Sequence, residues 1–187
     1  MATADQRPDP LAAFRIAREW FLAGHRIEMR ELSAELGVNR ATLFRWVGNR
    51  DDLLAEILWS LAEPTLAAAI DDAPGEGGQR VAAAIGRFAT QVDQAEFFRD
   101  FLRREPERAL RILTTRAGTV QSRLVTAVEA LLREEITAGH LDPPLPLRDL
   151  AYLIVRIAES FLYADIITGE QIDIARTEQA IAALLRS

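Results

Sequence analysis

Apolar residues recur at helical spacing along almost the whole chain, and this pattern constrains the fold more than any other feature. Leu11, Phe14, Ala17 and Phe21, for example, share one face of a helix. No stretch alternates with period two, and no hairpin turn signal separates two apolar runs. The sequence therefore predicts an all-α fold of roughly nine helices.

Start and stop signals set the limits of these helices. Asp9 followed by Pro10 is a favourable helix start, and Asn49 with Asp52 predicts a capping arrangement. The segment 71–78 predicts a loop, 142–146 a rigid break, and Pro64 a bend. Between these signals the predicted helices span about 10–23, 29–36, 40–47, 50–70, 79–93, 95–104, 106–116, 118–138, 147–168 and 172–185.

Composition excludes several classes of site. The 187 residues contain no Cys, which excludes disulfides, thiolate metal sites and a Cys nucleophile. The two His are distant in sequence, so we expect no metal site and no cofactor. No run approaches the roughly 18–20 apolar residues that cross a bilayer, and no signal peptide is evident. A soluble, cytoplasmic protein without a membrane partner is expected.

The charge is unevenly distributed. The net charge is -6, yet residues 1–50 carry 8 Arg and 6 acids, a net of +2, and residues 51–187 carry 14 Arg and 22 acids, a net of -8. Within the first part, residues 39–50 hold Arg40, Arg45 and Arg50 and no acid. This distribution predicts that the N-terminal part alone meets an anion.

Residues 29–47 have the layout of a helix-turn-helix motif. Two short predicted helices flank Gly37, which can adopt the positive φ that the turn requires. The second helix is predicted to expose donors and flat surfaces to a DNA major groove and its backbone. These side chains are Arg40, Thr42, Phe44, Arg45 and Trp46. Core packing of Trp46 is the alternative to its exposure.

The segment Leu36–Leu54, LGVNRATLFRWVGNRDDLL, resembles the recognition segment of TetR-family regulators. The segment Leu150–Glu170 resembles the subgroup of QsdR-type proteins, which control degradation of lactone quorum signals. The resemblance implies that Arg50 meets a phosphate and that Phe44 stands where Tyr is more common. It also implies a Thr near residue 28, where this chain has Glu28. Arg7 is interpreted as part of a solvated tail, or of an arm in a minor groove.

The same resemblance implies two domains. Residues 1–50 would form a three-helix, helix-turn-helix DNA-binding domain. A connecting helix would join it to a helical ligand-binding and dimerisation domain within residues 51–187. The helix 147–168 is apolar on two faces and therefore needs two partners, either its own core and a second copy or one chain alone. The interface candidates are Leu150, Ile154, Ile157, Phe161, Ile181 and Leu185.

A ligand pocket is expected between the connecting helix and the body. Its candidates are Trp59, Phe88, Phe97, Phe98, Phe101, Tyr152 and Arg156, although aromatics at such spacing also serve as ordinary core. Arg156 could bind a carbonyl or carboxylate of the ligand. Tyr152, Arg156, Glu159 and Tyr163 form a polar stripe. This stripe is a solvated face, a seam in the interface or a cavity wall.

The sequence thus predicts a homodimeric, ligand-responsive transcriptional regulator, expected to be a repressor. It would bind a palindromic double-stranded DNA operator and be released by a small amphipathic effector such as a lactone. No nucleophile–base pair, metal cluster or phosphate loop points to an enzyme. The alternative is a helical protein-interaction module, or a ligand-binding protein that does not bind DNA.

Overall fold

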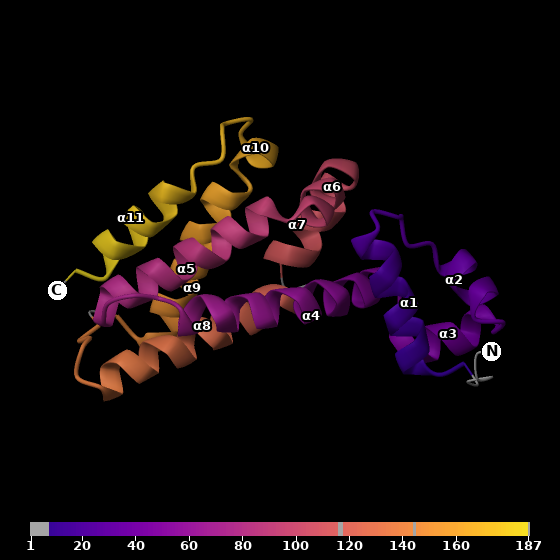
Figure 1. Ribbon diagram of the computed structural model, residues 1–187, viewed down its shortest axis with the longest axis horizontal. Helices are drawn as coiled ribbons and strands as arrows, with labels where there is room; N and C mark the ends of the chain where they lie inside the picture. Colours follow the sequence, from indigo (N-terminus) through magenta and orange to yellow (C-terminus); the bar gives the residue numbers. More distant parts are fainter. Residues whose placement is uncertain (1–7, 116–117, 144, 187) are drawn as a thin grey trace.

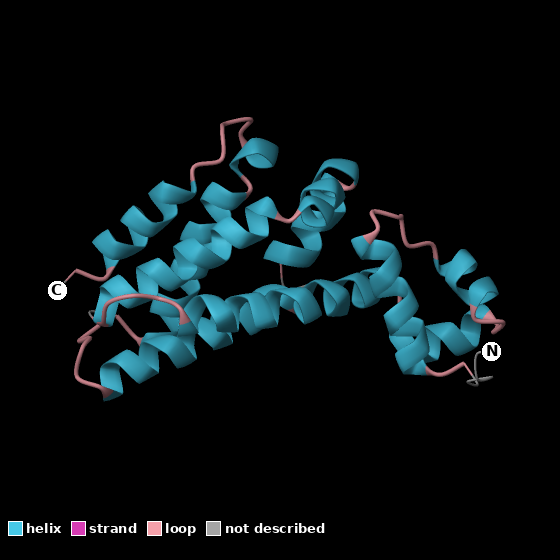
Figure 2. Cartoon of the chain, viewed as in Figure 1, coloured by secondary structure: helices cyan, strands magenta, loops and turns pink. Residues whose placement is uncertain are grey.

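The computed structural model describes residues 8–115, 118–143 and 145–186 (Figure 1). Arg7, Arg116 and Pro144, which lie within the predicted arm, helix 106–116 and break, are outside the described residues. The described residues contain helices and no strands, which confirms the all-α prediction (Figure 2). The helices are α1 (Pro10–Leu22), α2 (Met29–Glu35), α3 (Arg40–Val47), α4 (Arg50–Asp71), α5 (Gly77–Gln94), α6 (Glu96–Arg104), α7 (Pro106–Thr114), α8 (Val120–Thr137), α9 (Leu147–Leu162), α10 (Ala164–Ile167) and α11 (Ile174–Leu184).

Two boundaries differ from the predicted ones for identifiable reasons. Helix α5 begins inside the expected loop because its first residue, Gly77, donates its backbone N–H to the buried Glu135 carboxylate at 2.5 Å. The expected helix 147–168 divides at Tyr163 into α9 and α10. There the Leu162 carbonyl accepts a hydrogen bond from the Arg99 guanidinium at 3.2 Å, a partner from outside the helix.

The first three helices form a small head around buried apolar residues of each helix. Ala17, Leu32 and Leu43 are almost completely buried, one from each of α1, α2 and α3. Gly37 has a φ of 65°, the left-handed conformation that the turn between α2 and α3 requires. The local helix signals therefore produce a helix-turn-helix held against α1.

Helix α4 extends from the head along the body (Figure 1). Its 22 residues span about 33 Å. The Asn49 side chain accepts hydrogen bonds from the first turn while Asp52 accepts one from the Asn49 N–H, which confirms the predicted capping box. The helix continues through Pro64 to Asp71. By length and hydropathy alone α4 could cross a membrane, but it also carries Glu56 and Glu63 and buries one side against the protein.

Two apolar clusters form the core. The first continues from the head through the start of α4 into α6 and α7, and Phe21 packs edge-on against Phe101 with centroids 5.5 Å apart. The second lies among α5, α8, α9 and α11 and includes Leu132, Ile154 and Ile181. Since the first cluster crosses residue 50, the head is packed against the body through shared core residues.

Candidate DNA-binding surface and effector cavity

Helix α3 is fixed on one side and free on the other. Leu43 is 1% exposed and anchors the helix in the head. Asn39 caps its N-terminus by accepting a hydrogen bond from the Thr42 N–H at 2.8 Å. Arg40 and Arg45 are exposed, and Phe44 is 59% exposed. A helix held in this way presents its polar side without depending on a bound partner.

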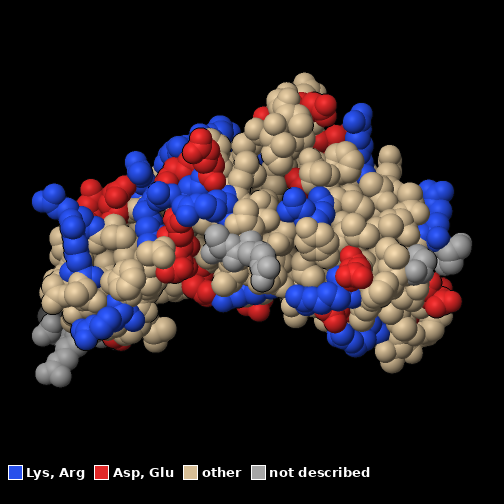
Figure 3. All heavy atoms as spheres, turned by 180° about the vertical axis from the view of Figure 1, so that it is seen from behind, with Lys and Arg blue, Asp and Glu red and all other residues tan. Residues whose placement is uncertain are grey.

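The remaining predicted DNA contacts differ in exposure. Thr42 is half-buried, and its hydroxyl accepts a hydrogen bond from Arg45 Nη2 at 3.3 Å, which orients that guanidinium. Trp46 is half-buried and packs partly against the head core, so both interpretations of this residue hold in part. Arginine side chains project from the head end of the molecule in the view from behind (Figure 3). Glu28 starts α2 without a side-chain cap and pairs with Arg26 at 2.8 Å.

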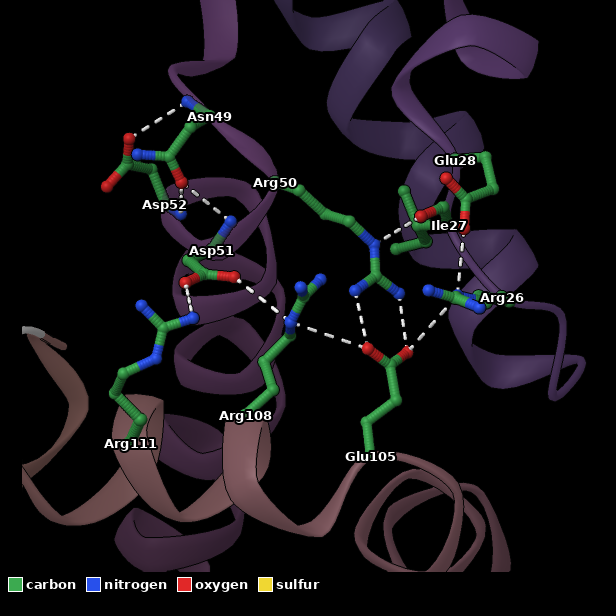
Figure 4. Close-up of polar contacts among 10 residues, drawn as sticks. All are labelled: Arg26, Ile27, Glu28, Asn49, Arg50, Asp51, Asp52, Glu105, Arg108 and Arg111. Atoms are coloured by element: carbon green, nitrogen blue, oxygen red, sulfur yellow. Dashed lines mark hydrogen bonds and ion pairs between the residues drawn. The ribbon is translucent and has the colours of Figure 1, made fainter.

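Arg50 faces the body rather than solvent. Its side chain is 12% exposed, and its Nη1 and Nη2 donate to the two oxygens of Glu105 at 2.6 and 2.5 Å (Figure 4). Its Nε donates to the Ile27 carbonyl. We call this set of contacts among Arg50, Glu105 and the Ile27 carbonyl the Glu105 clamp. In this conformation the guanidinium is occupied, so the expected phosphate contact would require the clamp to open.

Opposite charges surround the carboxylates of the Glu105 clamp and of the neighbouring Asp51. The hydrogen bonds from Arg50 lower the pKa of Glu105 below its ordinary value, against the opposing effect of burial. Arg108 lies 3.4 Å from Glu105 and 3.5 Å from Asp51, and Arg111 also pairs with Asp51. The first residues of α4, next to the recognition helix, are therefore tied to α7 and its N-cap residue Glu105 (Figure 4).

A partly open cavity of about 370 Å³ lies among α4, α5, α6, α7, α8 and α9. Most of its lining is aliphatic, with Leu58, Leu66, Ile85, Leu124 and Val155 among the contributors. Volume and lining are typical of a small-molecule site. The sequence predicted a cavity in this place, between the connecting helix and the body.

Only part of the predicted pocket set lines this cavity. Phe88, Phe97 and Phe98 do. Trp59 instead stacks with the Arg123 guanidinium, 5.6 Å from the ring centre. Phe101 packs against Phe21 in the first core cluster, and Tyr152 is 47% exposed. These three aromatics therefore lie away from the cavity.

The polar stripe on α9 divides between cavity and surface. Tyr152 and Arg156 are exposed, whereas Glu159 and Tyr163 are buried and line the cavity. The predicted i, i+3 pair is present, with Arg156 Nη1 2.6 Å from Glu159 Oε2. Burial raises the pKa of Glu159 to about 7, although the Arg156 guanidinium acts in the opposite sense. Burial also raises the pKa of Tyr163.

Arg156 connects the cavity with α7. The nitrogen that pairs with Glu159 also donates to the carbonyl of Thr114, the last residue of α7, at 3.2 Å. Helix α7 is thus bonded to the cavity wall at its C-terminus and to α4 at its N-terminus. Sequence reasoning missed Glu105, Arg108 and Arg111, because their partners lie more than fifty residues away and no local spacing reveals them.

The predicted interface residues also separate into two groups. Leu150, Ile154, Ile181 and Leu185 lie in the second core cluster of the same chain. Ile157 and Phe161 are half-buried and follow Leu153, which is 38% exposed, at intervals of four residues, and Ile157 also packs against the second core cluster. The first group is therefore buried within one chain, whereas the row at 153, 157 and 161, which we call the outer row of α9, keeps exposed apolar surface.

An exposed recognition helix, a long connecting helix and an apolar cavity in the body together define a ligand-responsive transcriptional regulator. Residues 76–186 match the model of the tetracyclin repressor-like C-terminal domain, and the chain belongs to the TetR family. Among solved structures, the transcriptional repressor QsdR of R. erythropolis is 32% identical with a TM-score of 0.87, covering 94% of this chain and 93% of that chain. Among the curated proteins no match is found.

More distant structures share the fold. The repressor AlkX from Dietzia sp. strain DQ12-45-1b, implicated in biodegradation of n-alkanes, is 23% identical with a TM-score of 0.63, covering 96% of this chain and 97% of that chain. FadR from Bacillus subtilis, solved in complex with stearoyl-CoA, is 12% identical with a TM-score of 0.59, covering 94% of this chain and 96% of that chain. The TetR fold and the QsdR-like character expected from the sequence are confirmed.

Proposed function

We propose that this chain is a cytoplasmic repressor that binds a palindromic operator as a homodimer and is released by a small amphipathic effector. The observation that carries the proposal is helix α3, anchored through Leu43 while Arg40 and Arg45 remain exposed. TetR-family regulators are generally not enzymes, and we propose no catalytic activity. A lactone is the effector candidate that the family resemblance implies.

Base reading is assigned to the exposed side of α3. Arg40 and Arg45 supply donors for base edges, with Thr42 orienting Arg45. Phe44 presses against the sugar-phosphate backbone, and the exposed part of Trp46 faces the groove. Arg50 is assigned to a phosphate only in a conformation with the Glu105 clamp open.

Salt dependence tests this assignment to DNA. If the dimer neutralises about six phosphates, the operator affinity should fall as the salt concentration rises. A plot of the logarithm of affinity against the logarithm of salt concentration should have a slope of about -5. Fluorescence anisotropy with a labelled operator between 50 and 300 mM salt measures the slope. A slope near zero contradicts binding through phosphates.

The homodimer is proposed to form through the outer row of α9, Leu153, Ile157 and Phe161. A single helix-turn-helix reads few bases, and a two-fold axis places two copies on adjacent turns of a palindrome. Each of these side chains is apolar and partly exposed in the isolated chain.

Ile157→Glu is expected to convert the dimer to a monomer, because it places a charge in an apolar interface. Sedimentation velocity at micromolar concentration measures the mass. Leu11→Glu, at an apolar side chain that is 78% exposed on α1, is the matched control and should remain dimeric. A dimeric Ile157→Glu protein would place the interface elsewhere.

Release is proposed to pass through α7. Its C-terminal carbonyl is bonded to Arg156 beside the cavity, and its N-terminal half is bonded to Arg50 and Asp51 beside the head. An effector that shifts α7 changes the angle between α4 and the head, and hence the separation of two recognition helices. Coupling of about 1–3 kcal/mol would weaken operator affinity roughly 5- to 150-fold.

A further inference from the structure

The lining of the cavity is poor in charge. Its side chains come from six helices and are mostly aliphatic or aromatic, and none of the lining residues is Arg, Lys or His. The polar contributions come from Thr65, Gln91, Glu159 and Tyr163. An effector bound here buries an apolar tail, and its headgroup must be satisfied by these few polar groups.

Two of those groups lie together. Glu159 lies in the last turn of α9 and Tyr163 is its C-cap, four residues on, and both buried side chains line the cavity. One oxygen of Glu159 is bonded to Arg156, and the other has only a long contact of 3.5 Å with Gln121. The Tyr163 hydroxyl has no hydrogen-bond partner among the described residues. This end of the cavity therefore holds a free acceptor and a free donor.

Charge decides which headgroups fit. A carboxylate or phosphate would meet the Glu159 carboxyl, and the two nearby cations, Arg156 and Arg99, lie outside the lining and are already paired with Glu159 and Asp93. A cationic headgroup gains little, because Arg156 already lies 2.6 Å from the same carboxyl. The raised pKa of Glu159 agrees with a site that disfavours net charge. An uncharged head avoids both difficulties.

We infer that this cavity selects uncharged amphiphiles whose headgroup donates a hydrogen bond to Glu159 and accepts one from Tyr163. A secondary amide has this combination in one small group, with the apolar tail lying between α4 and α5. The inference rests on the proposed function only in taking the cavity as the effector site. Fatty acid anions and acyl chains with anionic heads are excluded by it.

The test compares three ten-carbon probes on the full chain without DNA. Titration calorimetry at pH 8 would measure binding of N-methyldecanamide, decanoate and decylammonium. We expect N-methyldecanamide to bind at least about tenfold more tightly than either charged probe. Equal or tighter binding of decanoate or decylammonium, or no binding of N-methyldecanamide, would overturn the inference.

Variants of Glu159 and Tyr163 test whether these two residues produce the preference for the uncharged amide. Glu159→Gln keeps the shape and removes the charge, so the preference for the amide over decanoate should fall below about threefold. Tyr163→Phe should weaken amide binding about 3- to 10-fold, the effect of one neutral hydrogen bond. Glu134→Gln, at an exposed glutamate on α8, is the matched control and should match the wild type. Unchanged selectivity in Glu159→Gln would contradict the assignment.

Operator binding separates this inference from the proposed function. Anisotropy of a labelled operator with the ligand-free protein does not depend on the headgroup preference. If the protein binds the operator but does not bind N-methyldecanamide more tightly than the charged probes, only the headgroup inference is overturned. Failure of operator binding overturns the proposed regulator while leaving the calorimetric comparison valid.

Discussion

Replacing Glu105 with alanine should lower the free energy of unfolding by about 3–5 kcal/mol, because it leaves the Arg50 guanidinium buried without its charge partner. The two side chains are 14% and 12% exposed, and they form two hydrogen bonds of 2.6 and 2.5 Å. Urea unfolding followed by circular dichroism measures the change. The exposed pair of Arg15 and Glu19 is the control, and Arg15→Ala should cost no more than about 0.5 kcal/mol.

A double variant distinguishes a broken pair from a general loss of packing. Replacing Arg50 and Glu105 together by Met and Leu removes both charges, so much of the loss from Glu105→Ala should be recovered. A cost below about 1 kcal/mol for Glu105→Ala, or strictly additive effects in the double variant, would contradict the clamp.

Acid should remove the contribution of the Glu105 clamp to the free energy of unfolding. Because Arg50 lowers the folded-state pKa of Glu105 below its ordinary value of 4.5, the unfolded chain binds a proton at Glu105 more readily. The contribution of Glu105 to stability is therefore fully present above pH 4.5 and is lost as the pH falls through the lower folded-state pKa. Glu105→Gln should show a smaller loss of stability in this acidic range than the wild type.

Replacing Arg40 and Arg45 together by alanine should weaken operator binding by about 2–6 kcal/mol, or roughly 30- to 20,000-fold. Each exposed arginine is expected to make a base contact worth about 1–3 kcal/mol. The core anchor Leu43 is unchanged, so the head should stay folded. Anisotropy with operator and scrambled duplexes measures the loss and its sequence dependence.

The control for this double variant is Arg15→Ala, since Arg15 is an exposed arginine of the head that lies on α1 and pairs with Glu19. Its operator affinity should stay within about twofold of the wild type. An equal loss of affinity on operator and scrambled DNA would assign Arg40 and Arg45 to phosphates instead of bases.

Local chemistry explains which parts of the fold were predictable. The limits of α3, the positive φ of Gly37 and the Asn49–Asp52 capping box depend on residues within a few positions of one another. Each was readable from the sequence for that reason. The break of α9 at Tyr163 was missed because no Gly or Pro marks it, and the competing partner Arg99 lies 63 residues away.

The candidate sites were predictable only where one helix defines them. The exposed side of α3 follows from its own periodicity. In contrast, the apolar pattern of α9 does not distinguish a fully buried row from a partly exposed one, so Leu150 and Ile154 appeared equivalent to Ile157 and Phe161. The pocket had the same ambiguity, since Phe88 and Phe101 are both buried but only Phe88 lines the cavity.

We propose that this chain reads a palindromic DNA sequence through α3. Selection of bound duplexes from a random DNA pool, carried out with the wild type and with Arg40→Ala/Arg45→Ala, tests it most directly. We expect the wild type to select a palindromic consensus that the double variant loses. No enrichment of any sequence by the wild type at low salt would contradict it.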